Sequence, residues 1–182
     1  MYAHLINKYE SAIMIISSVQ KALVHRQTGF VVPCKLITGP QQRQQLDTAL
    51  QAFADACLFV WSYGKQHKIS QQWQLHQACY QQIRELYSLP ANLAIRAVAR
   101  VAPALKEDKV IFYPFPPNHV VFDSRTFTLK NDEWTVGLTL LQGREKFHLD
   151  IGNCQKKVLS GKHPASATLF KKYKSYYLDI QV

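Results

Sequence analysis

The sequence predicts an α+β fold in which a small antiparallel β-barrel carries a three-helix insertion after its first strand. Three observations lead to this prediction. Between residues 41 and 106, apolar side chains recur every three or four positions, which is the period of a helix with one buried face. After residue 109 they alternate with polar ones, which is the period of a strand. The length of 182 residues suits one compact domain.

Residues 29–40 are predicted to form the first barrel strand and the turn that follows it. Their segment GFVVPCKLI is rich in β-branched and aromatic side chains, which favour strands. Pro33 predicts that the strand lies at an edge or contains a bulge, because proline donates no ladder hydrogen bond. The residues before the strand, 1–28, are expected to form a tail or a short helix, with the true start at Met1 or Met14.

Residues 41–108 are predicted to form a helical insertion. Apolar side chains recur at steps of three and four along about 41–63, so this helix has one apolar face. Gly64 is expected to terminate it, since glycine is common just after the last helical turn. A second helix is expected at about 70–87, with Ser70 as its N-terminal cap.

The third predicted helix contains the most distinctive stretch of the chain, LPANLAIRAVARVAPALK (89–106). Pro103 is expected to kink or end it. Asn92, Arg96 and Arg100 recur at steps of four and therefore share one face. Their spacing suits guanidinium groups that bind successive phosphates. The alternative is that they form the solvated face of an otherwise apolar helix, and spacing alone does not decide between the two interpretations.

The remaining barrel strands are predicted within residues 109–182. Alternating apolar and polar residues mark six of them, separated by turns that contain asparagine, aspartate or glycine. Antiparallel neighbours joined by such short turns are expected to curl into a small barrel. The predicted strands are 110–114, 119–129, 134–141, 144–150, 166–170 and 174–182.

A net charge of +10 and an isoelectric point near 9.5 favour a polyanionic partner such as RNA, DNA or an acidic membrane surface. Basic residues are dense toward the C-terminus, where no acidic residue occurs between Asp150 and Asp179. Charge of this kind indicates a class of partner and does not choose among its members. The stretch without acids contains Lys156, Lys157, Lys162, Lys171, Lys172 and Lys174.

Two strand features join the helix stripe as candidate nucleic-acid-binding sites. In the segment KKYKSYY, lysines alternate with Tyr173 and Tyr176, which combines charge for phosphates with rings for base stacking. Arg144, Lys146 and His148 alternate along one face of a strand, as in a phosphate track. The alternatives are a hairpin with aromatic rings inward and lysines outward, and an ordinary charged surface strand.

The chain carries no catalytic motif, so we expect it not to be an enzyme. It contains no G-x-S-x-G sequence, no glycine-rich phosphate loop and no H-E-x-x-H sequence. Its cysteines at 34, 57, 79 and 154 lack metal-ligand spacing, so neither a metal site nor a cofactor is expected. Cysteines in apolar surroundings favour a reduced, cytoplasmic setting. The apolar run 12–16 is too short to span a bilayer, so no membrane partner is expected.

The stretch LPANLAIRAVARVAPALK, followed by FDSRTFTL and REKFHLDIG, resembles the N-terminal half of TnpB-like proteins. These are transposon-encoded RNA-guided DNA nucleases, related to type V CRISPR effectors. The similarity runs from about Gly29 to Val182. It implies that the barrel is a wedge domain and that the helices form a recognition lobe. Only Arg96 and Arg100 match the family motif as contacts to guide RNA or to the guide–target duplex.

In that family a RuvC-like nuclease domain begins about where Val182 stands, and no residue of this chain matches a catalytic position. The sequence therefore predicts a non-catalytic fragment that binds structured guide-type RNA, and DNA within the guide–target duplex. Alternatively, the chain is half of a split nuclease and docks through its C-terminal edge onto a separately encoded RuvC-like domain. Two further hypotheses are an antagonist that competes for guide RNA and a decayed transposon remnant without function.

Overall fold

The computed structural model describes residues 30–107 and 115–182. Within the compact unit Val31–Val182, the described residues form four helices and one antiparallel sheet of seven strands. The α+β class is therefore confirmed. The tail predicted at 1–28 and the strand predicted at 110–114 lie outside the described residues.

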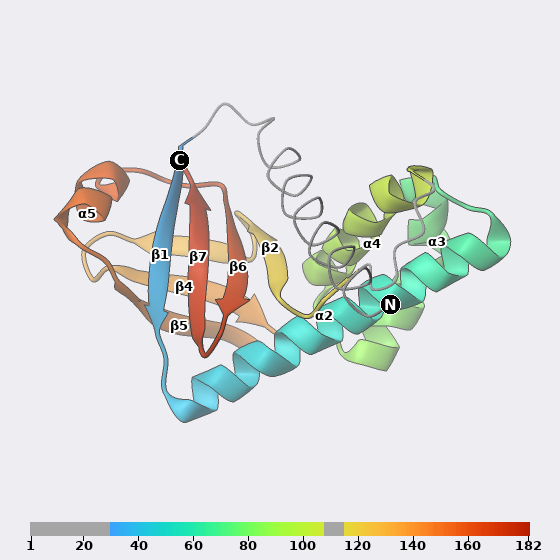
Figure 1. Cartoon of the computed structure of the whole chain (residues 1–182), viewed down its shortest axis with the longest axis horizontal. Coiled ribbons are helices and arrows are strands. Elements are labelled where there is room, and N and C mark those ends of the chain that lie inside the picture. Colours follow the sequence, from blue (N-terminus) through green and yellow to red (C-terminus); the bar gives the residue numbers. More distant parts are fainter. Residues whose placement is uncertain (1–29, 108–114) are drawn as a thin grey trace, which may run out of the picture. The chain divides into compact units, whose positions relative to one another are not determined.

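The three-helix insertion after the first strand is confirmed. Strand β1 (Val31–Ile37) leads into the long helix α2 (Pro40–His67), and α3 (Gln72–Tyr87) and α4 (Ala91–Lys106) follow. Figure 1 shows that α2 starts beside the sheet and ends among α3 and α4, so it belongs to both layers. A helix of 28 residues is about 42 Å long, which is enough for both contacts.

The predicted end of the first helix at Gly64 is wrong, and of the two outcomes predicted for Pro103, a kink or a helix end, the helix end does not occur. Gly64 is inside α2, and a Cβ there would lie 2.4 Å from Cδ1 of Leu105. This glycine permits a close approach to α4, and the helix instead ends at Lys68 in a left-handed conformation. Pro103 does not end α4, which continues to Lys106.

The sheet has the strand order β2-β6-β7-β1-β5-β4-β3, and every neighbouring pair is antiparallel. The C-terminal strand β7 pairs with β1 on one side and β6 on the other, so β7 is an internal strand of the sheet. The strands after the helices are β2 (His119–Asp123), β3 (Phe127–Lys130), β4 (Thr135–Leu140), β5 (Gly143–Asp150), β6 (Ser166–Lys172) and β7 (Ser175–Gln181).

The predicted barrel is not closed, because the strand predicted at 119–129 is two strands. A turn at Asp123 breaks it, with Oδ1 accepting hydrogen bonds from the backbone N–H of Arg125 at 3.0 Å and of Thr126 at 3.3 Å. The two halves, β2 and β3, then lie at opposite edges of the sheet. If the sheet were flat, its seven strands would place these two edges about 29 Å apart. The four peptide units that join the end of β2 to the start of β3 reach only roughly 14 Å. The sheet is therefore strongly curled, and no ladder joins β2 to β3.

Pro33 lies in an internal strand, so its predicted edge position is wrong for β1 as a whole. Strand β5 pairs with β1 only from Lys35 onward. Beside Pro33 the chain instead forms the short helix α5 (Asn153–Leu159), where a simple turn was predicted. Gln155 of this helix donates a side-chain hydrogen bond to the carbonyl oxygen of Pro33. The missing N–H of proline therefore interrupts no ladder on that side.

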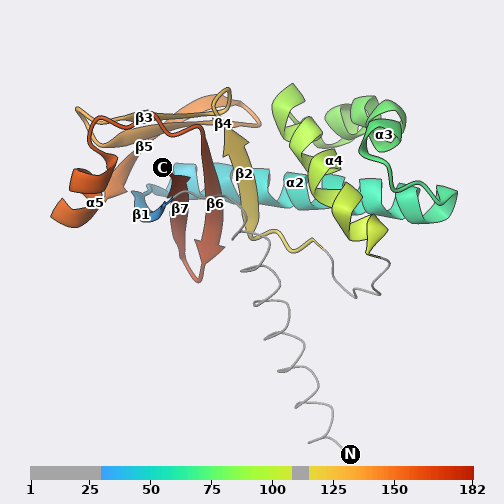
Figure 2. The ribbon, with the colours of Figure 1, turned by 90° about the horizontal axis from the view of Figure 1, so that it is seen from above.

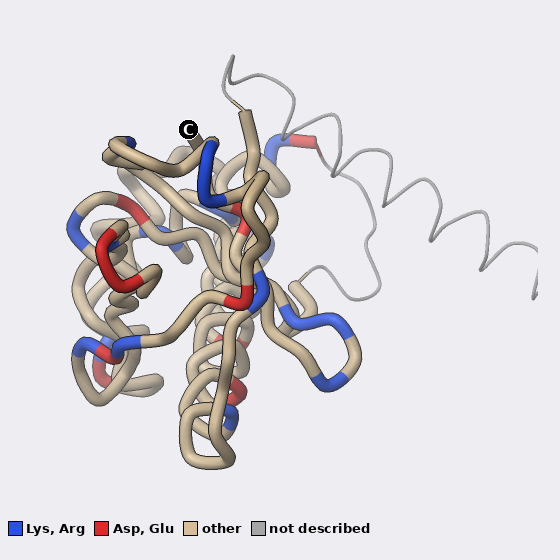
Figure 3. The backbone as a smooth tube through the Cα atoms, turned by 90° about the vertical axis from the view of Figure 1, so that its left-hand side faces the viewer, with Lys and Arg blue, Asp and Glu red and all other residues tan. Residues whose placement is uncertain are grey.

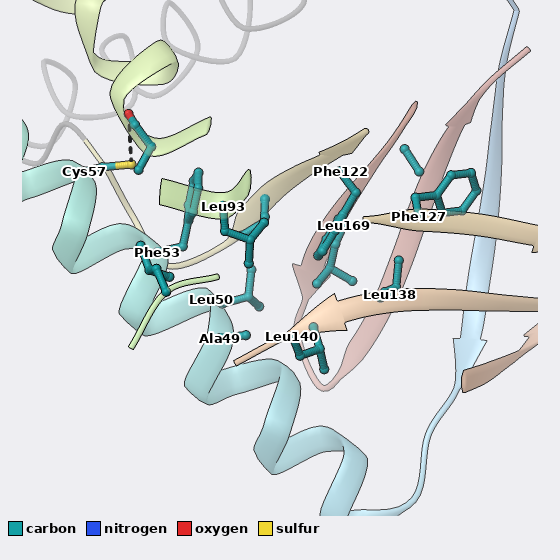
Figure 4. Close-up of a cluster of buried hydrophobic side chains, with 14 of the residues drawn as sticks. Ala49, Leu50, Phe53, Cys57, Leu93, Phe122, Phe127, Leu138, Leu140 and Leu169 are labelled. Carbon is teal, nitrogen blue, oxygen red and sulfur yellow. Dashed lines mark hydrogen bonds between the residues drawn. The ribbon is translucent and has the colours of Figure 1, made fainter. Parts of the chain in front are cut away.

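One hydrophobic core joins the helices to the concave side of the sheet. Figure 4 shows Leu50 and Phe53 of α2 and Leu93 of α4 next to Phe122 of β2 and Leu169 of β6. All five side chains are almost fully buried. Their positions follow the periods predicted from the sequence, three or four residues in the helices and two in the strands. The core fixes α4 against β2, and this contact determines the environment of the arginines described next.

Candidate nucleic-acid interface

Arg100 is partly buried where α4 meets β2. Its guanidinium group lies 5.7 Å from the ring centre of Phe53 and 5.4 Å from that of Phe115. It donates a hydrogen bond to the backbone oxygen of His119 at 3.1 Å and lies 3.3 Å from Nδ1 of the same residue. These contacts give Arg100 partners within the protein, and its role as a phosphate contact stays a prediction.

Arg96 of the same stripe also has a partner within the protein. Arg96 donates to Oδ2 of Asp123 at 3.2 Å, so the carboxylate that forms the turn after β2 also holds α4. Asn92 is half-buried, without a hydrogen-bond partner for its side chain among the described residues. Both arginines of the stripe therefore have partners within the protein, and their role as phosphate contacts stays a prediction. The two arginines attach α4 to the first strand of the returning sheet.

Burial, more than the contact with Arg100, sets the protonation of His119. A guanidinium group only donates hydrogen bonds, but Nδ1 of His119 also lies 2.9 Å from Oδ1 of Asn118, so which of the two contacts is a hydrogen bond depends on the tautomer of the ring. Burial, and next the charge of Arg100, lower the pKa of His119 to about 4. Burial also lowers the pKa of Arg100 below its ordinary value. The histidine is therefore neutral at neutral pH.

The basic face of β5 is present, but its charges have partners. Arg144, Lys146 and His148 are exposed, and Phe147 between them is buried, as the period of two predicts. Arg144 crosses Gly137 and donates to Oγ1 of Thr128 at 3.1 Å. Lys146 forms an ion pair with a carboxylate of the β3–β4 turn, Glu133. This face is therefore less available for phosphate than its charge count indicates.

The lysines around α5 form a second group. Lys156 is half-buried and lies 6.0 Å from the ring centre of Trp134. Lys157 and Lys162 are exposed, and within the described residues their ammonium groups form no ion pair. Figure 3 shows the basic residues at several separate places along the backbone, with acidic residues among them. The charge is therefore distributed over small clusters rather than gathered into one stripe.

Next to the tip of the β6–β7 hairpin, the predicted binding residues Lys171 and Tyr176 contact α2. Tyr176 is 2% exposed, so its ring is not accessible for base stacking in this structure. Its hydroxyl donates to Oδ1 of Asp47 on α2 at 2.7 Å, and Lys171 donates to the same oxygen at 2.6 Å. Burial, and next the hydrogen bond to Asp47, raise the pKa of Tyr176 well above its ordinary value. Asp47 therefore fastens the hairpin to α2.

The tip of the same hairpin is accessible. Lys172, Tyr173 and Lys174 are all exposed, and the Tyr173 side chain is 89% exposed. Among the described residues, none of the three makes a side-chain hydrogen bond or ion pair. Figure 2 shows that the turn between β6 and β7 reaches beyond the rest of the sheet. We call these three residues the hairpin tip, and it retains all the properties for which they were predicted.

Sequence reasoning missed Arg43 as a neighbour of this hairpin. Arg43 lies on the exposed side of α2, one helical turn before Asp47. Its backbone oxygen lies 3.3 Å from the Tyr176 hydroxyl, and its guanidinium charge favours the ionised form of that tyrosine. Arg43 and Tyr176 are separated by 133 residues, so no local pattern indicates their proximity.

A polar cavity of about 200 Å³ lies between the first turns of α2 and the β4–β5 turn. Gln41, Gln44, Gln45 and Gln142 line it together with Glu145. Gln45 donates to Glu145 at 3.3 Å, and its side-chain oxygen is buried without a hydrogen-bond partner. The lining carries one negative charge and no positive one, so the cavity does not suit phosphate.

The described residues contain no group of three or more histidine, cysteine, aspartate or glutamate side chains arranged to hold a metal ion. Burial raises the pKa of the thiols of Cys34 and Cys57 to about 12 and that of Cys79 to about 11. These three cysteines are therefore protonated at neutral pH and unreactive. In the same residues, no helix combines the length and apolar character needed to cross a bilayer.

Comparison with protein-family models and with curated proteins found no match for this chain. The resemblance to TnpB-like proteins therefore remains a hypothesis that rests on the three sequence segments alone.

Proposed function

We propose that this chain is a non-catalytic nucleic-acid-binding fragment of a TnpB-like RNA-guided endonuclease and that it binds structured RNA through the hairpin tip. The observation that carries the proposal is the exposed pair Lys172 and Lys174, which flank Tyr173 on a turn without acidic residues. Ammonium groups that project from a rigid hairpin suit contacts to phosphate, which dominate sequence-independent affinity.

The lysines near α5 extend the proposed contact. Lys162 precedes β6 and Lys172 ends it, so the two lie toward opposite ends of this strand. Seven strand residues span about 24 Å, a length over which a structured RNA presents several phosphates. The net charge of +10 favours association with any polyanion. We propose that the polyanion is bound at these accessible lysines.

The proposal is tested by electrophoretic shift of structured RNA at two salt concentrations. The wild type is expected to bind at low salt and to weaken as salt rises, because binding releases counterions. The double variant Lys172→Gln/Lys174→Gln is expected to lower the salt slope by about 1.4 to 1.8, given roughly 0.7 to 0.9 for each lost phosphate contact. Binding that is absent at low salt, or indifferent to salt, contradicts the proposal.

A matched control separates the hairpin tip from general charge. The double variant Lys106→Gln/Lys130→Gln removes the same charge from exposed positions at the ends of α4 and β3. It is expected to keep nearly the wild-type salt slope. An equal loss in both double variants means that net charge alone binds RNA, and the assignment to the hairpin then fails.

A further inference from the structure

The backbone conformation at Tyr173 does not favour a tyrosine at this position. The residue is the first of a two-residue turn between Lys172 and Ser175, and its φ is +54°. Glycine and asparagine adopt this left-handed conformation readily, whereas a residue with a large Cβ substituent is strained in it. The ring is 89% exposed, so it contributes little packing in return. A strained and exposed aromatic residue at a turn indicates selection for a contact outside the protein.

The ring is presented on a fixed support. Lys171 and Tyr176 face each other across the hairpin, one pair before the turn, and both are held by Asp47 of α2. The lysine ammonium also lies 5.5 Å from the ring centre of Tyr176. An anchored hairpin loses less conformational freedom on binding than a mobile loop, which favours a specific contact at its tip.

The neighbours of Tyr173 indicate what it contacts. Both flanking side chains are ammonium groups, and Ser175 follows them, so the tip offers one isolated ring between two cations. A membrane interface is favoured by a larger apolar surface than one ring. A nucleotide offers both required features, since its base has an open π-face and its neighbours carry phosphates.

Resting on the proposed function, we infer that Tyr173 stacks on an unpaired base while Lys172 and Lys174 bind the phosphates beside it. Inside a duplex both faces of each base are covered by neighbouring bases, so no face remains for the ring. Unpaired bases in loops, bulges and overhangs leave a face open. The hairpin tip therefore selects structured RNA that contains unpaired nucleotides over continuous duplex.

The test compares two RNAs, a stem-loop with a single-stranded overhang and a long blunt duplex, against wild type, Tyr173→Phe and Tyr173→Gly. Tyr173→Gly is expected to weaken binding of the overhang RNA by about 5- to 150-fold, the range for one lost base–ring stack. It should leave duplex binding unchanged. Tyr173→Phe keeps the ring and is expected to bind both RNAs like the wild type.

A thermal melt of Tyr173→Gly excludes misfolding as the cause. Glycine relieves the left-handed strain, so the unfolding temperature is expected to stay the same or rise. A ring with a structural role would instead lower that temperature, and this result would overturn the inference.

The outcomes separate the inference from the proposed function. Should Tyr173→Gly bind both RNAs like the wild type while the lysine double variant loses both, the stacking inference fails and RNA binding through the lysines stands. Should the wild type bind neither RNA, both fail. Loss of binding to vesicles of anionic lipid, with RNA binding intact, would reassign the tip to a membrane surface and also overturn the inference.

Discussion

The arginines of α4 and the lysines of the hairpin tip carry the same charge and were predicted to do the same work, yet their surroundings are opposite. Arg100 lies between two rings and a backbone oxygen, and Arg96 faces a carboxylate. Lys172 and Lys174 extend into solvent. The comparison teaches that a basic residue is available to a phosphate only when the fold supplies no acceptor of its own.

Replacing Arg100 should have the largest effect on stability. Arg100→Ala removes a charged hydrogen bond and the packing of the side chain, and it is expected to lower the free energy of unfolding by about 3 kcal/mol. Urea denaturation measures this. Lys172→Ala is the control from the other region, with an expected change within about 0.5 kcal/mol. Equal stability of the two variants would contradict the structural role of Arg100 and the difference between the two regions.

Low pH should weaken the same contact between Arg100 and His119 without a mutation. The folded pKa of His119, about 4, lies below its ordinary value of 6.5, so the folded state binds fewer protons between these pH values. The contribution of neutral His119 to the free energy of unfolding is therefore complete above pH 6.5. It is lost as the pH falls toward 4, and the loss amounts to at most about 3 kcal/mol. Urea midpoints across this range measure the loss. In His119→Asn, which retains an acceptor near Nδ1, the dependence should flatten, and an unchanged slope would contradict this assignment.

The anchor of the hairpin connects the two regions of the comparison. Asp47→Ala leaves Tyr176 and Lys171 without their shared acceptor and is expected to lower the free energy of unfolding by about 2 kcal/mol. It should also weaken RNA binding, because the tip is then less rigidly held. Asp55→Ala on the same helix is the control and should change stability by roughly 0.5 kcal/mol or less. Equal effects on stability in both variants would remove the case for an anchor.

The smallest expected effect separates the two roles of basic residues most directly. Arg96→Gln loses a partly exposed ion pair and should lower the free energy of unfolding by about 1 kcal/mol. RNA affinity should stay at the wild-type level, measured at the low salt concentration used for the lysine double variant. A marked loss of affinity in the folded variant would restore Arg96 as a phosphate contact.

Much of the fold was predictable because its signals are local. The periods of the apolar residues identified α2, α3, α4 and the strands β4, β5, β6 and β7 in the correct order. The split of 119–129 was not predicted, because its alternation continues through a turn that Asp123 creates with its own side chain. Helix α5 was missed, since seven residues give too short a period to recognise.

The candidate site divides in the same way. Lys172, Tyr173 and Lys174 were found from composition and spacing, and the fold leaves them exposed. Tyr176 has the same spacing, but the alternation of strand side chains turns it inward toward Asp47. That Asp47 lies there is a tertiary fact, since 129 residues separate the two.

By itself, the sequence determined the identity of most helices and strands, the excess of positive charge and the exposure of one hairpin turn. These properties depend on residues close together in the chain. Only the tertiary structure decided that the sheet stays open and which basic side chains have hydrogen-bond or ion-pair partners within the protein. Arg96 and Arg100 find their partners in Asp123 and His119, 27 and 19 residues away, and Lys171 finds its partner across 124 residues. The partner of a charged side chain is set by which residues the packed core places next to it. The core forms through contacts between residues far apart in the sequence, and no local pattern predicts these contacts.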